Sequence, residues 1–343
     1  MKAMILAAGF GTRLSELGLA LPKPLYPVCN VSLIRHAVAH LVGHGITEIM
    51  VNLHHQGELI RAELGDGRAL GAVIHYSLEE GQILGTGGGV KRALPFFEGE
   101  TFVLMNGKIV IDLDLHAAIA LHRGLGAAAT MVLKPDPRAA EWGAIGVDPA
   151  GRIRRFLEAP DPLPEDVTEH MFTGIHILEP TFIEALPDGP CCIVQAGYRP
   201  AFASGAVLGG WVHEGYFWDH SSPSRFLQGN LNLVNGSGRS LHPPGPLRGA
   251  HPTADIHQSA RIDDTVLIGA GARIEADAVL GPEVVIGSGA TVPAGCRLSR
   301  TLVFAGARAR GDADSAVIAP DGTVLAVDLD EVGPRTGPAL KQR

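Results

Sequence analysis

The chain has few aromatic residues and no excess of positive charge. Phe, Trp and Tyr make up 5% of its 343 residues, whereas glycine contributes 44, which predicts tight turns and packing through small residues. The formal net charge is −8, which argues against a general surface for nucleic acid or for anionic membranes but leaves room for a local cationic pocket that binds phosphate. No apolar run approaches the length that crosses a bilayer. The N-terminal run, Met1 to Ala8, is too short for a signal peptide, so we expect a cytoplasmic protein.

Cysteine is also rare, and its positions exclude two common kinds of site. The four cysteines are Cys29, Cys191, Cys192 and Cys296. They lack the spacing of a zinc site, and two adjacent cysteines are a poor basis for a disulfide framework. We therefore expect reduced thiols, as in the cytoplasm. With 46% apolar residues, the chain is long enough for a sizeable core and for two domains of unequal size.

The most informative stretch is the N-terminal one, MKAMILAAGFGTRLSELGLALPKPL. Its apolar run predicts a buried strand, Met4 to Ala8, which leads directly into Gly9 and Gly11. A strand that ends in a glycine loop can bring backbone N–H groups close to phosphate oxygens. Arg13 adds a guanidinium group suited to phosphate, and Lys23 follows between two prolines that stiffen its segment. A glycine loop by itself is often only a turn, but this combination indicates phosphate binding.

Further along, the apolar pattern alternates between helix and strand. Ser32 to Gly43 has one apolar helical face, Ile46 to Leu53 reads as a buried strand, Glu58 to Leu64 as a helix, and Val73 to Leu78 as another strand. This alternation predicts a parallel sheet with helices on both faces and ligands at the carboxyl ends of the strands. Gly85 to Gly89 then forms a second glycine-rich loop that opens a helix running through Leu94; it could approach a flat ligand or be a flexible surface turn.

The last third of the chain has a different period. Gly, Ser and Pro are concentrated after Asn235, which predicts a linker over 236–250. Beyond it, one large apolar residue recurs at every sixth position: Ile256, Ile262, Ile268, Ile274, Leu280, Ile286, Val292 and Leu298. Such hexads are typical of a parallel β-helix, in which each hexad forms one face of a triangular coil. We expect this β-helix over 251–308 and an irregular tail over 309–343.

Two of these segments resemble a known family. LAAGFGTRL followed by PKPLYPV resembles the signature of the sugar-1-phosphate nucleotidyltransferases, which join a nucleoside triphosphate to a sugar 1-phosphate. The resemblance covers most of residues 1–235 and implies an α/β nucleotidyltransferase domain with a Rossmann-like mixed sheet of the GT-A-like kind. The hexads resemble the short left-handed parallel β-helix appended to many members, where it mostly serves oligomerisation. We therefore expect a homo-oligomer formed through the β-helix, or a hetero-oligomer with an active paralogue.

The resemblance also implies roles for individual residues. The end of the first strand and the glycine loop would bind the nucleotide, through Leu6, Ala7, Ala8, Gly9, Gly11, Thr12 and Arg13. Lys23 would reach the α-phosphate, Gly85 would meet the base, and Asn106 would complete the nucleotide site. The sugar phosphate would be met by Gly143, Glu158 and Thr173. Asp219 would be a ligand of Mg²⁺.

Two positions depart from the family pattern. The family usually has Gly-Asp after the strand that ends near Asn106, and that aspartate holds Mg²⁺, but this chain has Lys108 there. Either the Lys108 ammonium occupies the place of the metal and neutralises triphosphate charge, or metal-assisted transfer is lost and the domain only binds nucleotides. Asp112 is another carboxylate nearby, which we expect to face elsewhere. Ala159 replaces the lysine that would meet the sugar phosphate.

The substrates are narrowed by three further segments, LHHQGELIRAELGDG, IHYSLEE and LGTGGGVKRALP. They look most like bacterial enzymes that act on mannose 1-phosphate or on N-acetylmuramate 1-phosphate, and the hexad tail favours the guanylyl-transferring mannose group. We expect GTP with mannose 1-phosphate, or UTP with an amino-sugar 1-phosphate. One alternative is a catalytically impaired nucleotide-sugar-binding or regulatory homologue. Another is an acyltransferase built on the hexads, for which only His251 and His257 stand near the first coil.

Overall fold

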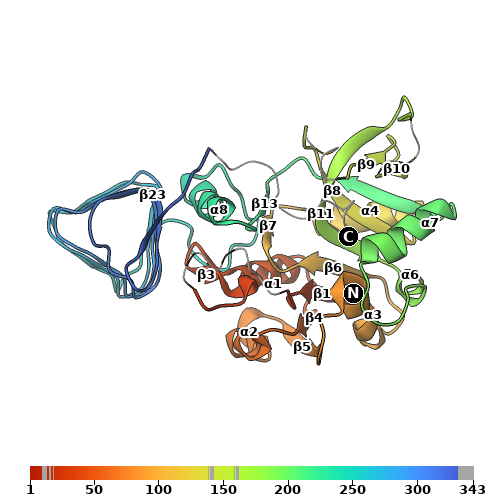
Figure 1. Cartoon of the computed structure of the whole chain (residues 1–343), viewed down its shortest axis with the longest axis horizontal. Helices are drawn as coiled ribbons and strands as arrows, with labels where there is room; N and C mark the ends of the chain where they lie inside the picture. The colour runs from red at the N-terminus through yellow and green to blue at the C-terminus, as the bar shows by residue number, and fades with distance from the viewer. Residues whose placement is uncertain are drawn as a thin grey trace.

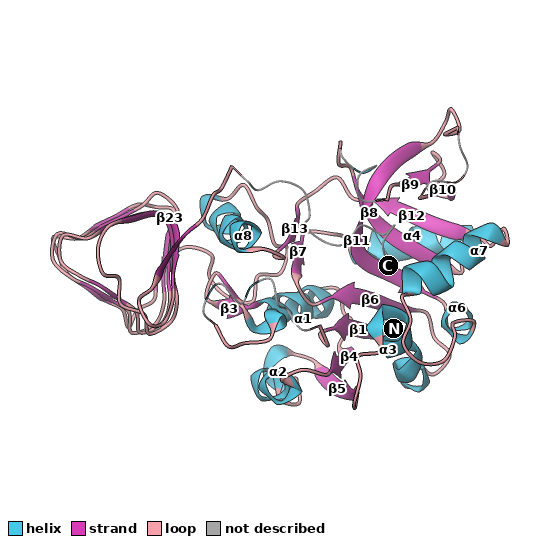
Figure 2. Ribbon diagram, in the orientation of Figure 1, coloured by secondary structure: helices cyan, strands magenta, loops and turns pink. Residues whose placement is uncertain are grey.

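The computed structural model describes residues 1–9, 14, 17, 19–137, 139, 143–157, 159 and 162–330. The chain forms an α/β domain and, beside it, a triangular coil of short strands that Figure 1 shows end-on. The arrangement of helices and strands in both parts can be followed in Figure 2. Within these residues, no helix combines the length and apolar character needed to cross a membrane.

The α/β domain is built on a nine-stranded mixed sheet with the order β10-β9-β11-β6-β1-β4-β5, to which β8 and β12 are added beside β11. The strands are β1 (Ala3–Leu6), β4 (Glu48–Leu53), β5 (Val73–Leu78), β6 (Phe102–Asn106), β8 (Ala129–Lys134), β9 (Ile145–Val147), β10 (Ile153–Phe156), β11 (Thr168–Leu178) and β12 (Leu208–Val212). Neighbours among β6, β1, β4 and β5 are parallel, whereas β11 is antiparallel to β6, β8 and β9. The expected mixed sheet is confirmed, and its parallel part is the N-terminal one.

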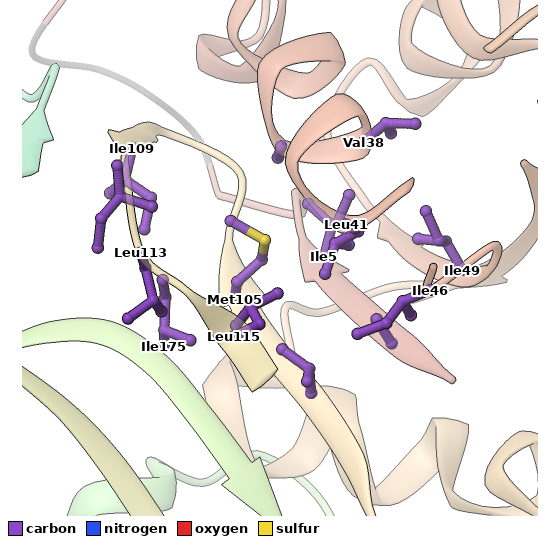
Figure 3. Packing of buried hydrophobic residues seen from close by; sticks show 14 of the residues in the cluster. Ile5, Val38, Leu41, Ile46, Ile49, Met105, Ile109, Leu113, Leu115 and Ile175 are labelled. Carbon is purple, nitrogen blue, oxygen red and sulfur yellow. The ribbon is translucent and has the colours of Figure 1, made fainter. Parts of the chain in front are cut away.

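Helices cover both faces of this sheet because its strands are apolar on both sides. On β1, Ala3 and Ile5 belong to one core and Met4 to the other. The first face is covered by α1 (Leu33–Gly43), α2 (Gly57–Leu64) and α4 (Leu115–Leu125). Figure 3 shows Ile5 beside Val38 and Leu41 of α1. The second face is covered by α3 (Gly85–Ala93), α6 (Pro180–Glu184) and α7 (Arg199–Ala203).

Shorter elements complete the domain. They are the hairpin β2 (Pro27–Val28) and β3 (Val31–Ser32), the pair β7 (Ile109–Ile111) and β13 (Phe217–Asp219), the 3-10 turns η2 (Lys23–Leu25), η3 (Arg68–Leu70) and η4 (Leu94–Phe97), and the π-helical turn η5 (Val194–Tyr198). The 13-residue helix α8 (Pro223–Asn235) ends the domain. The predicted strand Val73 to Leu78 is confirmed as β5. We expected the glycine run Gly85 to Gly89 to be a loop that opens a helix. Instead, the run itself lies inside α3.

The C-terminal part is a parallel β-helix, as the hexads predicted. Its strands are β14 (Gly249–Ala250), β15 (Asp255–Ile256), β16 (Arg261–Ile262), β17 (Val266–Ile268), β18 (Arg273–Ile274), β19 (Val279–Leu280), β20 (Val284–Ile286), β21 (Thr291–Val292), β22 (Arg297–Val303), β23 (Ala313–Ile318) and β24 (Val324–Ala326). Val266 pairs with Val284, 18 residues on, so three hexads make one coil. From Ile268 onward the hexad residues are buried, whereas Ile262 is 38% exposed because it lies near the open end.

The expected irregular tail over 309–343 is wrong for its first part. β23 pairs in parallel with β22, and β24 turns back antiparallel to β23. The hexad period ends there because Leu302 pairs with Val317, 15 residues on, so this last coil is three residues shorter than a full one. The segment therefore closes the β-helix. The remainder of the predicted tail lies outside the described residues.

The β-helix packs on α8 through one face. Leu267, Val285, Leu302 and Val317 are stacked on consecutive coils and share a core with α8 residues such as Leu231. Two polar contacts flank this core: Asn30 Nδ2 donates to Ile286 O at 2.9 Å, and Asn235 Nδ2 donates to Glu283 Oε1 at 2.8 Å. The two parts therefore share a continuous apolar core rather than being joined by a linker alone.

Candidate active site

The predicted nucleotide residues that the structure describes gather where β1 and β6 end. Leu6 is paired with Asn106 across these strands, and Gly107 N donates to Leu6 O at 3.1 Å. Ala7, Ala8 and Gly9 follow β1 at the same edge. Carboxyl ends of parallel strands are where α/β sheets place their ligands. Gly11, Thr12, Arg13 and Glu158 lie outside the described residues.

A buried hydrogen-bond network that the sequence did not reveal holds this edge together. Ala7 N donates to Asn52 Oδ1 at 2.7 Å, and Asn52 Nδ2 donates to Glu79 Oε1 at 2.7 Å. The second carboxylate oxygen, Glu79 Oε2, accepts from Leu84 N at 2.7 Å. Asn52 and Glu79 are each only 2% exposed. The network therefore links the chain after β1 to the start of α3, which carries Gly85.

Glycine is required at several positions of α3 for steric reasons. Gly85 has φ +69°, and a Cβ there would lie 2.7 Å from Cys191 O. A Cβ on Gly89 would lie 2.7 Å from Glu79 Oε1, inside the network just described. The start of α3 is also bound to the neighbouring segment, because Gly87 N donates to Cys191 O at 2.9 Å. The glycines thus allow a helix to lie closely against Glu79 and the Cys191 backbone.

Lys108 and Asp219 meet directly. Lys108 lies in the turn before β7, and Asp219 ends β13, where it is paired with Ile109. Lys108 Nζ lies 2.7 Å from Asp219 Oδ2. The Asp219 side chain is fully buried, whereas that of Lys108 is 30% exposed. The aspartate that resemblance assigned to a metal is therefore bound to an ammonium group.

The surroundings of Asp219 fix its backbone. Arg225 Nε donates to Asp219 O at 2.9 Å, and its guanidinium carbon lies 4.4 Å from the centre of the Trp218 ring. His220 N donates to Lys108 O at 3.2 Å. Burial lowers the pKa of the fully buried His220 to about 3, so this imidazole is neutral at pH 7. Asp219 thus has the Lys108 ammonium at its carboxylate and the Arg225 guanidinium at its backbone carbonyl.

These residues do not fit a divalent cation. Lys108 and Asp219 together carry no net charge, whereas an aspartate at position 108 would give the pair a charge of −2. The Lys108 ammonium is also in contact with the buried Asp219 carboxylate. Mg²⁺ prefers several oxygen ligands in octahedral geometry. Asp112, the other carboxylate that we considered, lies 2.8 Å from His213 Nε2 and belongs to a different contact, as expected.

The predicted sugar side is only partly described. Thr173 is fully buried, and its Oγ1 donates to Val132 O at 2.7 Å, so the side chain is held within the sheet. Gly143 is buried and has φ +93°. Gly174 also has φ +93°, and a Cβ there would overlap the side-chain amide of Asn106. This bend in β11 lets the predicted sugar strand contact the predicted nucleotide residue Asn106.

Lys23 lies further along the chain, after the glycine loop. It begins η2 and is half-buried between Pro22 and Pro24. The segment is anchored by Tyr26, whose hydroxyl lies 2.8 Å from Leu14 O and whose side chain is 1% exposed. The anchor fixes the place from which Lys23 extends.

Comparison with known proteins identifies the class. A family model described as nucleotidyl transferase matches residues 2–189, and one described as bacterial transferase hexapeptide, with six repeats, matches residues 259–300. The chain belongs to the nucleotidyl transferase family. More particularly, it is a sugar-1-phosphate nucleotidyltransferase with C-terminal hexapeptide repeats, as the resemblance of its N-terminal motif implied. Members of this family typically depend on Mg²⁺.

Curated relatives align over different shares of the chain. It is 30% identical over 310 residues to a mannose-1-phosphate guanylyltransferase of Mycobacterium tuberculosis, which covers 89% of this chain and 80% of the relative. A mannose-1-phosphate guanylyltransferase of Arabidopsis thaliana is 29% identical and covers 90% and 82%. A UTP–glucose-1-phosphate uridylyltransferase of Synechocystis is 39% identical over 202 residues, covering 55% and 52%. The solved structure of HddC from Yersinia pseudotuberculosis shares the fold, with a TM-score of 0.56 and 22% identity over 67% of this chain and 97% of that one.

Proposed function

We propose that the chain transfers a nucleotidyl group with either GTP and mannose 1-phosphate or UTP and an amino-sugar 1-phosphate as its substrates. The guanylyltransferase relatives support the first pair, because they align through the hexapeptide repeats as well as the catalytic domain. The Synechocystis uridylyltransferase aligns over only about half of the chain but with higher identity, which keeps the uridylyl alternative open to test.

In the proposed reaction, an oxygen of the sugar 1-phosphate attacks the α-phosphorus of the triphosphate in line. A new P–O bond forms, the bond to the β-phosphate breaks, and pyrophosphate leaves. The protein supplies little covalent chemistry: it aligns two anions and neutralises the charge that develops on the α-phosphoryl oxygens. We assign the triphosphate to Arg13 and the backbone after β1, and the α-phosphate to Lys23. Gly85 would meet the base, while Gly143, Glu158 and Thr173 would line the sugar side.

One observation carries the proposal for the charged part of the site. Lys108 lies two residues after Asn106, at the carboxyl end of β6, and Asn106 is paired with Leu6 at the end of β1. An ammonium group at this edge, held in place by the buried Asp219, can neutralise phosphate charge without a metal ion. The proposed reaction therefore needs no Mg²⁺ at this position. The Lys108 ammonium would stand in for the ion that the family typically uses.

A second function is favoured by the same contact. If the charge of Lys108 is fully used by Asp219, the site loses a cation near the α-phosphate, and Ala159 supplies none on the sugar side. The chain would then bind a nucleotide or nucleotide sugar without turnover, as a regulatory partner of an active paralogue.

We further propose that the domains are 1–235 and the β-helix, that the β-helix mediates oligomerisation, and that the protein works in the cytoplasm, where nucleoside triphosphates are made.

The test is pyrophosphate release from each nucleoside triphosphate with a panel of sugar 1-phosphates. Release with GTP and mannose 1-phosphate, or with UTP and an amino-sugar 1-phosphate, is the expected result. Arg13→Ala and Lys23→Ala variants should lower the rate strongly, whereas Arg68→Ala, a surface change in η3, should not. Absence of release with every pair, together with calorimetric binding of a nucleotide sugar, would favour the regulatory function. Absence of both would contradict both proposals.

A further inference from the structure

A cluster of histidines lies away from the candidate active site and belongs to no part of the proposed reaction. His40 is on the last turn of α1 and His44 is the C-cap residue of that helix. His116 is in the first turn of α4, and His242 comes from the segment between α8 and the β-helix. His44 is at the centre: its ring centroid lies 4.7 Å from that of His40, 5.1 Å from that of His242 and 5.4 Å from that of His116. Three distant segments of the chain thus bring imidazole rings together.

A carboxylate completes the cluster. Asp114 is the N-cap of α4, and its Oδ1 accepts from His116 N at 2.9 Å, which holds the carboxylate at the start of the helix. His116 Nδ1 lies 3.6 Å from the same oxygen. One ligand atom from each of His44, Asp114 and His116 can be chosen so that all three lie within 4.8 Å of one another. These donors therefore converge on one small volume at the surface.

The central ring is held in the form that a metal ion requires. His44 Nδ1 lies 2.8 Å from His40 O. A carbonyl oxygen only accepts, so Nδ1 carries the proton and donates, and Nε2 keeps its lone pair. A histidine that donates one ring N–H to a backbone carbonyl and offers the other nitrogen is the usual arrangement of a metal-binding histidine.

Two further features show that the cluster is built into the fold. A Cβ on Gly43 would overlap the His242 ring, so glycine at this position is what lets the segment after α8 reach His44. His40, beneath His44, is 5% exposed, and within the described part of the chain neither of its ring nitrogens has a hydrogen-bond partner. Buried polar groups without partners are unusual in folded proteins unless water or an ion meets them.

We propose that His44, Asp114 and His116 bind a divalent transition-metal ion of the zinc class, with His242, whose ring lies against that of His44, moving in as a fourth ligand. Imidazole and carboxylate donors in a set of four match tetrahedral Zn²⁺, whereas Mg²⁺ and Ca²⁺ prefer all-oxygen sites. Zinc–nitrogen bonds of about 2.0–2.1 Å place neighbouring ligands about 3.3 Å apart. The cluster must therefore contract on binding. The Asp114 and His116 side chains can move to do so, because they are 63% and 71% exposed.

Such an ion would join the end of α1, the start of α4 and the segment that leads to the β-helix. It would fix that segment to the α/β domain at a point separate from the apolar contact of α8 with the β-helix. The site is therefore structural in character and does not depend on the proposed reaction. Metal binding can be measured whether or not the protein turns over any sugar phosphate.

The test is metal binding by the full chain, purified without a polyhistidine tag and stripped with chelator. Zn²⁺ is titrated in competition with a chromophoric chelator, and Co²⁺ binding is followed by its visible absorption. We expect about one equivalent of Zn²⁺ and an intense tetrahedral Co²⁺ spectrum. Asp114→Asn, which retains a good N-cap, and His116→Ala should each weaken binding by about tenfold or more. His242→Ala should weaken it as well.

Matched controls separate this site from other sources of binding. His75→Ala removes an exposed histidine on β5, outside the cluster, and should leave the affinity unchanged. Circular dichroism of each variant checks that the fold is retained. Absence of Zn²⁺ binding by the wild-type chain would overturn the proposal. So would equal affinity in the Asp114 and His116 variants, or a Co²⁺ spectrum with thiolate charge-transfer bands, which would place the ion at Cys191 and Cys192.

Discussion

Position 108 determines the charge of the site through a single side chain. Lys108 and Asp219 form an ion pair with no net charge. The variant Lys108→Asp would place two carboxylates, with a total charge of −2, at the same position. Because two close carboxylates without a counter-ion are unfavourable, we expect this variant to acquire divalent-cation binding. Mn²⁺ bound by the protein, measured by electron paramagnetic resonance, reports the change independently of turnover.

The matched control for this variant is Arg92→Asp, which makes the same change in charge at an exposed residue of α3. It should bind no more Mn²⁺ than the wild-type chain at the site. Equal Mn²⁺ binding by wild-type and Lys108→Asp proteins would show that Lys108 does not occupy the place of a metal.

Glu79 has a structural role that is also testable at the residue scale. Its two oxygens accept hydrogen bonds from Asn52 Nδ2 and Leu84 N. In Glu79→Gln, the side-chain NH₂ group would replace one of these oxygens and would face an N–H donor instead of accepting from it. Leaving a buried donor unsatisfied costs about 1–3 kcal/mol. Urea denaturation should show a loss of this size, with weaker nucleotide binding. Glu80→Gln, at the exposed neighbour, should leave both unchanged; equal effects of the two substitutions would contradict the role assigned to the network.

Sequence reasoning identified Lys108 and Asp219 but not their contact. The residues were singled out because of their positions in motifs, and their ion pair depends on the pairing of β7 with β13, which are about a hundred residues apart in the chain. Asn52 and Glu79 were missed altogether. Each looks like an ordinary polar residue at the end of a strand, and only the order of β1, β4 and β5 in the sheet makes them adjacent.

At the scale of elements, two helical glycines should respond oppositely to the same substitution. In α3, a Cβ on Gly88 would overlap Gly189 O, a backbone atom that cannot turn aside. Gly88→Ala should therefore destabilise the fold by about 1–3 kcal/mol through overpacking. In α4, Gly124 is exposed and nothing lies within 4 Å of the added Cβ. Gly124→Ala should stabilise the helix by up to about 1 kcal/mol, because alanine has the higher helix propensity.

Thermal and urea denaturation of the two variants measures both effects. Stabilisation by Gly88→Ala would show that α3 does not pack against Gly189 as described.

The sequence suggested a loop at Gly85 to Gly89 because four glycines in five residues are poor helix formers. Tertiary packing outweighs that preference, since α3 lies so close to the Cys191 segment that larger residues would not fit. The helices and strands with clear apolar patterns, such as α1 and β4, were predicted correctly because that pattern directly reflects burial.

At the scale of the whole molecule, several buried neutral histidines make stability depend on pH. Burial lowers the pKa of His36 to about 4 and those of His176 and His220 to about 3. The unfolded chain, with histidine pKa values near 6.5, then binds more protons than the folded one below that pH. Stability is therefore fully present above pH 6.5 and falls as the pH decreases towards 4, by about 1.4 kcal/mol per pH unit for each such group.

Thermal unfolding between pH 7.5 and pH 5 checks this dependence, and His176→Gln supplies a comparison. His176 contacts the Tyr198 hydroxyl through Nδ1 at 2.9 Å, and glutamine can replace that contact without a titrating ring. The variant should be less stable than wild type at pH 7.5, but its stability should fall less steeply with acidification. Parallel pH profiles for the two proteins would contradict a buried neutral His176.

The overall organisation was the most predictable feature, because the hexads repeat without interruption and the N-terminal motif is specific. The way in which the β-helix attaches to α8 was not predictable. Leu267, Val285 and Leu302 occupy outward positions in the hexads, and only the placement of α8 shows that they form a shared core. The closing strands β23 and β24 were missed for a similar reason, since their pairing follows the coil geometry after the six-residue period has ended.

The central claim is that this sugar-1-phosphate nucleotidyltransferase works with an ammonium group where a divalent ion would otherwise be held. The measurement that tests it most directly is pyrophosphate release in excess chelator and in Mg²⁺, with whichever substrate pair from the panel supports release. The account predicts that release persists in chelator for the wild-type chain and becomes dependent on the ion in Lys108→Asp. Release by the wild-type chain that requires Mg²⁺ and is abolished by chelator would contradict it.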